Sequence, residues 1–258
     1  MKSAVERVIS TMKANLGDPI TIDDMARTAM FSKFHFSRMF QRVTGISPGR
    51  FLSALRLQEA KRLLLSCSLT VADISHLVGY NSIGTFSSRF RMSVGVSPTT
   101  YRQYGGYVQP LGEYEPPRWG RGERSVVRGY VHHAAGHRPG HIVIGLYQDR
   151  IAQGIPEAHA TLDSAGEFTI PGVPAGTWHV LAHSVDVDGH RDQSVESYVA
   201  AFGPVKVSAS SPVRPMDLWL RPRHIFDPPT LLAQLDETMW FTNAWVPGRA
   251  DEAALPGA

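Results

Sequence analysis

The sequence predicts two domains of different fold class: an all-α domain over residues 1–107, and an all-β antiparallel sandwich with a C-terminal helix over residues 125–240. Three observations support this prediction. The first part contains a duplicated pair of amphipathic helices, the second contains a series of short β-type runs, and the charge changes sign between them. A chain of 258 residues is long enough to bury two separate hydrophobic cores.

The charge of the chain is divided unevenly between the two parts. Residues 1–107 contain 14 Lys and Arg against 6 Asp and Glu, a net charge of +8. Residues 108–258 contain 12 Lys and Arg against 17 Asp and Glu, a net charge of −5. A concentrated positive charge is what a surface that binds a polyanion requires, so the first part is a candidate for nucleic-acid binding.

The apolar residues are distributed as in a cytoplasmic protein. No stretch approaches the roughly 18 consecutive apolar residues of a membrane-spanning helix, so we expect no membrane partner. Residues 1–16 place apolar side chains at helical spacing among charged ones, which predicts a folded helix rather than a signal peptide. The only cysteine, Cys67, lies among leucines and is interpreted as a packing residue.

The first part of the chain contains an internal repeat. Residues 21–24 return as residues 70–73, an offset of 49. Further along, an offset of 50 relates Ser32, Phe36, Phe40, Gly45, Ser47, Pro48 and Phe51 to Ser82, Phe86, Phe90, Gly95, Ser97, Pro98 and Tyr101. The one additional residue falls between the two matched blocks, which predicts a turn there with a helix on either side.

Each copy of the repeat reads as two short helices joined by a tight turn. Thr21 and Thr70 are each followed three residues later by Asp, a variant of the capping box that begins a helix. In the second copy Gly79 supplies a turn residue that tolerates left-handed backbone. Apolar residues recur at helical spacing before the turns (Ile22, Met25, Ala26, Ala29 and Val71, Ile74, Val78) and after them (Phe36, Met39, Phe40, Val43 and Phe86, Phe90, Val94).

We call these helix pairs the first and second heads. Two short helices at such a turn form the geometry that places the second helix in the major groove of DNA. The alternative is a helical bundle without a ligand. Residues 48–65 read as one long helix that would hold the heads apart, and heads about 34 Å apart can enter successive major grooves. DNA is favoured by the polar faces of the second helices: Lys33, His35, Ser37, Arg38 and Arg42, then Thr85, Ser87, Ser88, Arg89 and Arg91.

These residues lead to a family resemblance. The pattern Asp73-Ile74, Gly79-Tyr80, Phe86, Phe90, Gly95, Ser97-Pro98 and Tyr101-Arg102 resembles the signature of the AraC/XylS transcription regulators, and Arg56, Ala60, Leu63 and Leu64 resemble its linker helix. The resemblance covers residues 3–104. It implies a monomeric reader of double-stranded DNA with seven helices that contacts two adjacent major grooves. Because such regulators usually act as activators, RNA polymerase is an expected partner.

The resemblance also implies which residues contact DNA. The first head would offer Phe34, Ser37 and Arg38 to base edges, with Arg38 suited to guanine and a phosphate contact as its alternative. The second head would present Ile83, Gly84, Thr85, Ser87 and Ser88. Here the sequence departs from the family, which often has a long polar residue at the positions of Gly84 and Ser88, so we expect weaker reading. Lys33, Arg42, Arg89 and Arg91 are expected on the phosphate backbone.

The second part begins after a Pro- and Gly-rich stretch, residues 108–124, which predicts a linker. β-type runs follow at 125–133, 141–147, 158–162, 167–170, 177–184, 205–207 and 215–220. Residues 163–178, rich in Gly and Pro, resemble the carboxypeptidase regulatory-like and transthyretin-like β-sandwich modules. Asp227 with Pro228 and Pro229 predicts the start of a helix, with one apolar face formed by Leu231, Leu232, Leu235 and Met239. Residues 241–258 read as a flexible tail.

The role of the second part stays open between several functions. We expect a regulatory domain that binds a small-molecule effector, with Trp178, Trp219 and Trp240 as a possible pocket, or that forms a homodimer. A metal-binding or transthyretin-like hydrolase module is the alternative, since nine of the 11 histidines lie here, including His132, His133, His137 and His141. Glycines and prolines between these histidines argue against a metal, and no nucleophile motif is present. We therefore expect no cofactor, no metal and no enzymatic activity.

Overall fold

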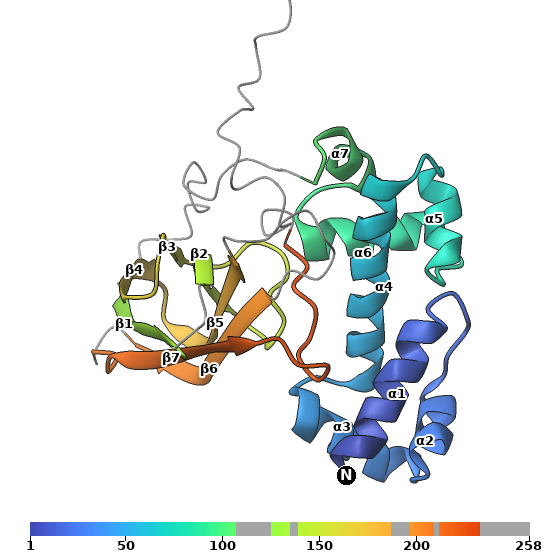
Figure 1. Ribbon diagram of the computed structural model, residues 1–258, viewed down its shortest axis with the longest axis horizontal. Helices are drawn as coiled ribbons and strands as arrows, with labels where there is room; N and C mark the ends of the chain where they lie inside the picture. Colours follow the sequence, from blue (N-terminus) through green and yellow to red (C-terminus); the bar gives the residue numbers. More distant parts are fainter. Residues whose placement is uncertain (107–124, 135–138, 187–196, 209–211, 233–258) are drawn as a thin grey trace, which may run out of the picture.

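The computed structural model describes residues 1–106, 125–134, 139–186, 197–208 and 212–232 (Figure 1). The predicted linker at 108–124, the predicted tail at 241–258, His137 and Trp240 lie outside the described residues. A helical domain and a β domain lie side by side in Figure 1. No helix within the described ranges combines the length and the apolar character that crossing a membrane would require.

The helical domain consists of α1 (Lys2–Ala14), α2 (Ile22–Ala29), α3 (Lys33–Thr44), α4 (Pro48–Ser66), α5 (Val71–Leu77), α6 (Ile83–Val94) and α7 (Pro98–Gln103). The predicted helix pairs are α2 with α3 and α5 with α6, and α4 is the long helix between them (Figure 1). The apolar stripes predicted from the repeat are buried in one core, where Phe36, Phe40 and Phe51 meet edge to face. Phe86, Phe90 and Tyr101 form the equivalent chain of rings in the second copy.

The β domain consists of β1 (Ser125–His133), β2 (Pro139–Tyr147), β3 (His159–Leu162), β4 (Glu167–Val173), β5 (Gly176–Asp186), β6 (Ser197–Val207) and β7 (Met216–Pro222). They form one hydrogen-bonded sheet in the order β3-β2-β5-β6-β7-β1-β4. The sheet curves around a core of alternate side chains, among them Val127 and Val131 of β1 and Leu218 and Leu220 of β7. The end strands β3 and β4 contact each other, so the sheet is nearly closed.

Two predictions about the β domain need correction. The sheet is not purely antiparallel, because β1 and β7 run parallel, with Gly129 opposite Met216 and His133 opposite Leu220. These strands lie at opposite ends of the domain sequence, and a parallel pair requires the long connection that the intervening strands provide. The helix predicted from Asp227 does not begin there: residues 228–232 have no regular structure, and the remainder lies outside the described residues. Leu231 and Leu232, predicted on one face of that helix, are buried in two different clusters.

Candidate nucleic-acid interface

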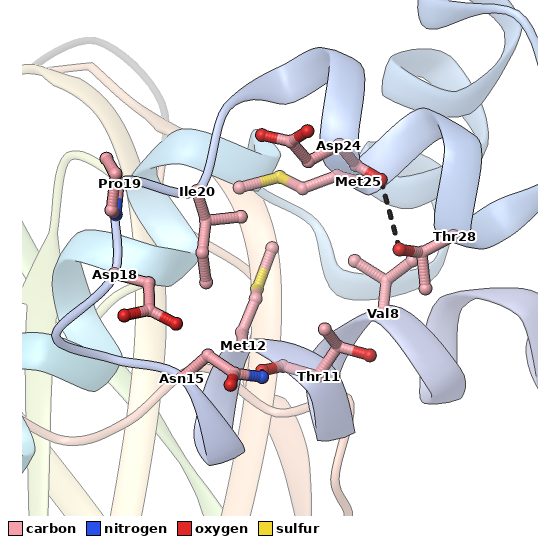
Figure 2. A pocket seen from close by; sticks show the side chains of 10 residues that line it. All are labelled: Val8, Thr11, Met12, Asn15, Asp18, Pro19, Ile20, Asp24, Met25 and Thr28. Atoms are coloured by element: carbon pink, nitrogen blue, oxygen red, sulfur yellow. Dashed lines mark hydrogen bonds between the residues drawn. The ribbon is translucent and has the colours of Figure 1, made fainter.

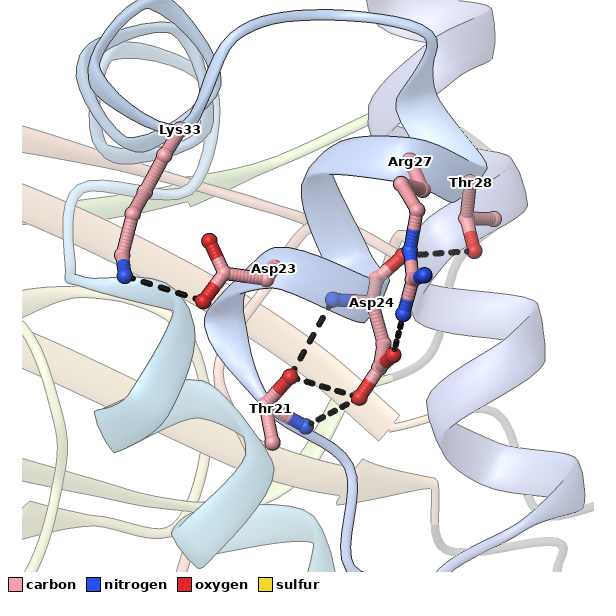
Figure 3. Close-up of polar contacts among 6 residues, drawn as sticks. All are labelled: Thr21, Asp23, Asp24, Arg27, Thr28 and Lys33. Atoms are coloured by element: carbon pink, nitrogen blue, oxygen red, sulfur yellow. Dashed lines mark hydrogen bonds and ion pairs between the residues drawn. The ribbon is translucent and has the colours of Figure 1, made fainter.

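The first helix of each head begins with the predicted capping box. The Oγ1 of Thr21 accepts a hydrogen bond from the backbone N–H of Asp24 (3.2 Å), and the Asp24 carboxylate accepts one from the backbone N–H of Thr21 (2.9 Å) (Figure 3). Thr70 and Asp73 repeat this pair in the second head, with both distances at 3.1 Å. The Thr21 hydrogen bonds and an ion pair with Arg27 lower the pKa of Asp24 to about 2. The box satisfies backbone donors that a helix start leaves free.

The two turns that follow differ by one residue, as the offsets of the repeat predict. Met30 ends α2 in the left-handed region, with φ of 60°. In the second head Val78 ends α5 and Gly79 takes the left-handed conformation, with φ of +81°. The hydroxyl oxygens of Ser32 and Ser82 then accept hydrogen bonds from the backbone N–H groups of His35 and Thr85. These caps start α3 and α6 at matching positions of the repeat.

The helices α3 and α6 match in length and in burial. Each has 12 residues and ends in a glycine of left-handed conformation, Gly45 or Gly95. Because Phe36 and Phe40 in α3 and Phe86 and Phe90 in α6 face the core, the opposite faces of both helices are directed outward. The exposed residues include all the predicted DNA contacts except the half-buried Ser37 and Ser87: Lys33, Phe34, Arg38, Arg42, Ile83, Gly84, Thr85, Ser88, Arg89 and Arg91.

The first head carries contacts that orient its exposed side chains. The Arg38 guanidinium lies over the Phe34 ring, 5.4 Å from its centre, and Phe34 is 72% exposed. The Ser37 hydroxyl donates to the carbonyl of Lys33 (2.8 Å), so this donor is already used within the helix. Arg38 thus lies at the surface with its guanidinium in cation–π contact with the Phe34 ring.

An ion pair that the sequence did not predict joins the two helices of the first head. Lys33 of α3 reaches across the turn to Asp23 of α2, with Nζ and Oδ2 3.0 Å apart (Figure 3). The two residues are ten positions apart, so no helical spacing relates them. Both side chains are more than half exposed, which keeps the pair weak. Ala72 replaces Asp23 in the second head, which therefore lacks the acidic partner.

The linker helix α4 connects the heads through Arg56. Its Nε donates to the carbonyl of Leu16 (2.9 Å) and its Nη2 to the carbonyl of Asp18 (2.6 Å). A side chain on Gly79 would meet both partners, because its Cβ would lie 2.5 Å from the Leu16 oxygen and 2.6 Å from Arg56 Nη2. The connection between α1 and α2, the linker helix and the turn of the second head therefore meet at one point.

A small cavity lies beside the first head rather than on its exposed face. It measures about 220 Å³ and lies between α1, α2 and the residues that connect them (Figure 2). None of the predicted base contacts lines it. Met12, Met25, Val8 and Ile20 supply its apolar walls, and Asp18 and Asn15 lie at its edge (Figure 2).

The tryptophans of the predicted ligand pocket do not come together in the described residues. Trp178 is 7% exposed, lies in the core of the β domain and donates from Nε1 to the carbonyl of Pro174 (3.0 Å). Trp219 is 63% exposed and stacks on His132, with ring centres 4.5 Å apart. The cause is strand alternation: the buried neighbours Leu218 and Leu220 direct Trp219 outward.

The described histidines are also dispersed. His132 bonds to Asp217 (2.7 Å), and His141 lies 3.3 Å from an oxygen of Asp163. Within the described ranges, no three His, Cys, Asp or Glu side chains gather as metal ligands would.

Comparison with known proteins places this site among DNA-binding domains. Residues 25–104 match a family model described as a helix-turn-helix domain. The transcriptional regulator GbdR of Pseudomonas aeruginosa is 32% identical over 42% of this chain and 29% of its own length. The transcriptional activator AarP of Providencia stuartii is 29% identical over 39% of this chain and 74% of its own.

A solved structure gives a match of the same extent. An AraC-type regulator from Chromobacterium violaceum is 28% identical over 42% of this chain and 96% of that chain, with a TM-score of 0.38. This chain spans less than a third of the length of GbdR, so the matches concern the helix-turn-helix region alone. Residues 25–104 of this chain therefore carry a helix-turn-helix domain similar to those of transcription regulators.

Proposed function

We propose that this chain is a sequence-specific transcription regulator that reads two adjacent major grooves of duplex DNA with α3 and α6. The observation that supports this most directly is the duplication: both helices have the same length, follow a turn that contains one left-handed residue, and present an exposed, basic and polar face. The net charge of +8 over residues 1–107 adds the long-range attraction to phosphate. Base edges are read by Phe34, Ser37 and Arg38, and more weakly by Ile83, Gly84, Thr85, Ser87 and Ser88.

The mode of regulation follows from the relatives. AarP and the lactose operon regulator of Staphylococcus xylosus are both named as activators. We extend this role to the present chain, with RNA polymerase as the partner that an activator requires. The β domain then serves as the regulatory part of the protein, binding a small-molecule effector or a second copy of the chain, with a carboxypeptidase regulatory-like sandwich as its nearest architecture.

The test is selection of duplexes from a random pool by the full chain, followed by affinity measurements over a range of salt. Four phosphate contacts by Lys33, Arg42, Arg89 and Arg91 predict a slope of log affinity against log salt of roughly −4. Arg42→Gln should make this slope shallower by about 1. Arg128→Gln is the matched control, because it removes the same charge from an exposed position on β1. A full chain that enriches no duplex, or an affinity indifferent to salt, would refute the proposal.

A further inference from the structure

The loop between β2 and β3, residues 148–158, leaves the β domain and enters the helical domain. Its Ile151 is 2% exposed and belongs to the core of the helical domain, together with residues of α1 through α7. The loop has no regular secondary structure, so its course is set by these contacts. Because Ile151 belongs to the β domain and is buried in the core of the helical domain, its burial stabilises the contact between the two domains.

At one end, the loop contacts the point where the first head joins the linker helix. Asp149 forms an ion pair with Arg50 in the first turn of α4, with Oδ2 and Nη2 2.8 Å apart. The Arg50 guanidinium lowers the pKa of Asp149. The next side chain, Arg150, lies directly against Gly45, the residue that ends α3. The loop therefore covers the C-terminal end of α3, the second helix of the first head.

At its other end, the loop contacts α6, the second helix of the second head. The backbone N–H of Gly154 donates to the carbonyl of Ser93 in the last turn of α6 (2.7 Å), and the Ser93 hydroxyl donates to Oε1 of Gln153 (3.4 Å). Carbonyls in the last turn of a helix have no partner within the helix, so the loop supplies one. Gly154 has φ of +67°, and a Cβ there would lie 3.1 Å from the carbonyl oxygen of Met92. The close approach therefore requires glycine.

The loop is held against the sheet by the segment that follows β7. The backbone N–H of Leu231 donates to the carbonyl of Ala152 (2.9 Å), and the Leu232 carbonyl accepts from Nζ of Lys61, a buried residue of α4 (3.1 Å). Thr230 links the same segment to His183 on β5, with Oγ1 and Nδ1 3.0 Å apart. In Figure 1 this segment runs between the sheet and α4. The loop is thus anchored to the β domain as well as to both heads.

We propose that residues 149–154 act as a brace that fixes α3 and α6 relative to each other. Asp149 and Gly154 are then positioning residues for DNA recognition. The inference rests on the proposed function. The brace contacts α3 and α6 at their C-terminal ends, whereas the predicted base contacts lie in their N-terminal halves, where all but the half-buried Ser37 and Ser87 are exposed. It adds a further connection between the heads, besides α4 and the junction of Leu16, Arg56 and Gly79, without occupying the surface proposed to meet DNA.

The consequence concerns the spacing between the two DNA subsites. One additional base pair between them shifts the second subsite by roughly 3.4 Å and rotates it by roughly 34°. Heads held rigidly cannot follow this change, whereas heads without the brace can adjust in part. The brace therefore raises the discrimination between the selected duplex and the same duplex with one base pair inserted.

The experiment uses the full chain and a duplex that it selects from a random pool, with the two subsites located by footprinting. Affinity is measured for this duplex and for the version with one inserted base pair. We expect the insertion to weaken wild-type binding roughly tenfold, the scale of one mismatched base pair. In Asp149→Lys and in Gly154→Val, the ratio of the affinity for the selected duplex to that for the inserted duplex should fall by about threefold. Arg50→Glu in the Asp149→Lys background should restore it, because the ion pair reforms with reversed charges.

Asp163→Lys is the matched control, since it makes the same charge change at a fully exposed position between β3 and β4. It should leave the ratio unchanged. A second measurement needs no DNA: spin labels at Gln41→Cys and Ser88→Cys, in a Cys67→Ser background, report the distance between α3 and α6. Its distribution should broaden in Gly154→Val. Unchanged ratios in both brace variants and an unchanged distance distribution in Gly154→Val would overturn the brace alone. Failure to enrich any duplex would overturn the proposed function and with it the role of the brace in DNA recognition.

Discussion

Substitution of Gly79 by alanine tests whether the junction at Arg56 holds the second head in place. Gly79 has φ of +81°, a conformation that costs an L-residue about 1–2 kcal/mol. Its new Cβ would also lie 2.5 Å from the backbone oxygen of Leu16 and 2.6 Å from Nη2 of Arg56, so one of them must move. Losing a hydrogen bond from a charged donor costs about 1.5–3 kcal/mol. Since part of this loss can be relieved by rotation of Arg56, we expect Gly79→Ala to lower the free energy of unfolding by about 2–4 kcal/mol.

The matched control for this prediction is Gly95→Ala. Gly95 has φ of +100° and nothing within 4 Å of the position of a Cβ, so only the backbone cost of about 1–2 kcal/mol applies. Urea unfolding of the full chain, followed by far-ultraviolet circular dichroism, measures both losses. If the two variants lose the same free energy within about 0.5 kcal/mol, the close approach at Gly79 has no energetic weight and the junction argument is wrong.

Three further predictions concern stability, DNA reading and pH. Met30→Gly should stabilise the helical domain by about 1 kcal/mol, because Met30 is left-handed and 74% exposed; an unchanged urea midpoint would contradict this. Arg38→Ala should cost about 1–3 kcal/mol on the selected duplex and relax preference at one base pair, whereas Ser88→Ala costs much less; equal losses on selected and random duplexes would make Arg38 a phosphate contact. Burial lowers the pKa of His183 to about 3 in the folded chain. The buried neutral imidazole therefore contributes its full stability above the ordinary pKa of 6.5, and this stability is lost as the pH falls toward 3. Between pH 7 and 4.5 the free energy of unfolding measured by urea titration should fall by about 2–3 kcal/mol. If His183→Gln loses the same free energy over this range, groups other than His183 cause the loss.

The first head shows how far local sequence patterns determine this protein. The capping residues Thr21 and Thr70 and the apolar stripe with Phe36 and Phe40 act within a few residues along the chain. Their spacing therefore predicts the helices and the turns directly, and the structure confirms them. The outward faces of α3 and α6 follow as well, because burying one side of a helix exposes the other.

Most strands of the β domain were also predicted close to their positions, since alternation with period two and turn residues are local signals, but the run at 205–207 covered only the end of β6 (Ser197–Val207). Their pairing was not. The parallel alignment of β1 with β7 joins residues more than 80 positions apart, Gly129 with Met216, and no local pattern encodes which distant strands meet. The same reason explains the positions of Trp178 and Trp219, whose burial depends on which face of the sheet became the core.

Only the tertiary structure decided how the two domains meet. The pair of Arg50 with Asp149 spans 99 positions and that of Lys61 with Leu232 spans 171, so the sequence offers no spacing from which to infer them. Asp227 with its prolines carries a local helix signal, yet residues 228–232 are not helical, because Leu231 and Leu232 are buried in separate clusters and bond to the loop and to α4. The sequence by itself determined the helices and the outward faces of α3 and α6 through local propensity and burial. The contacts of residues 149–154 with both heads are long-range, and only the folded chain brings them together.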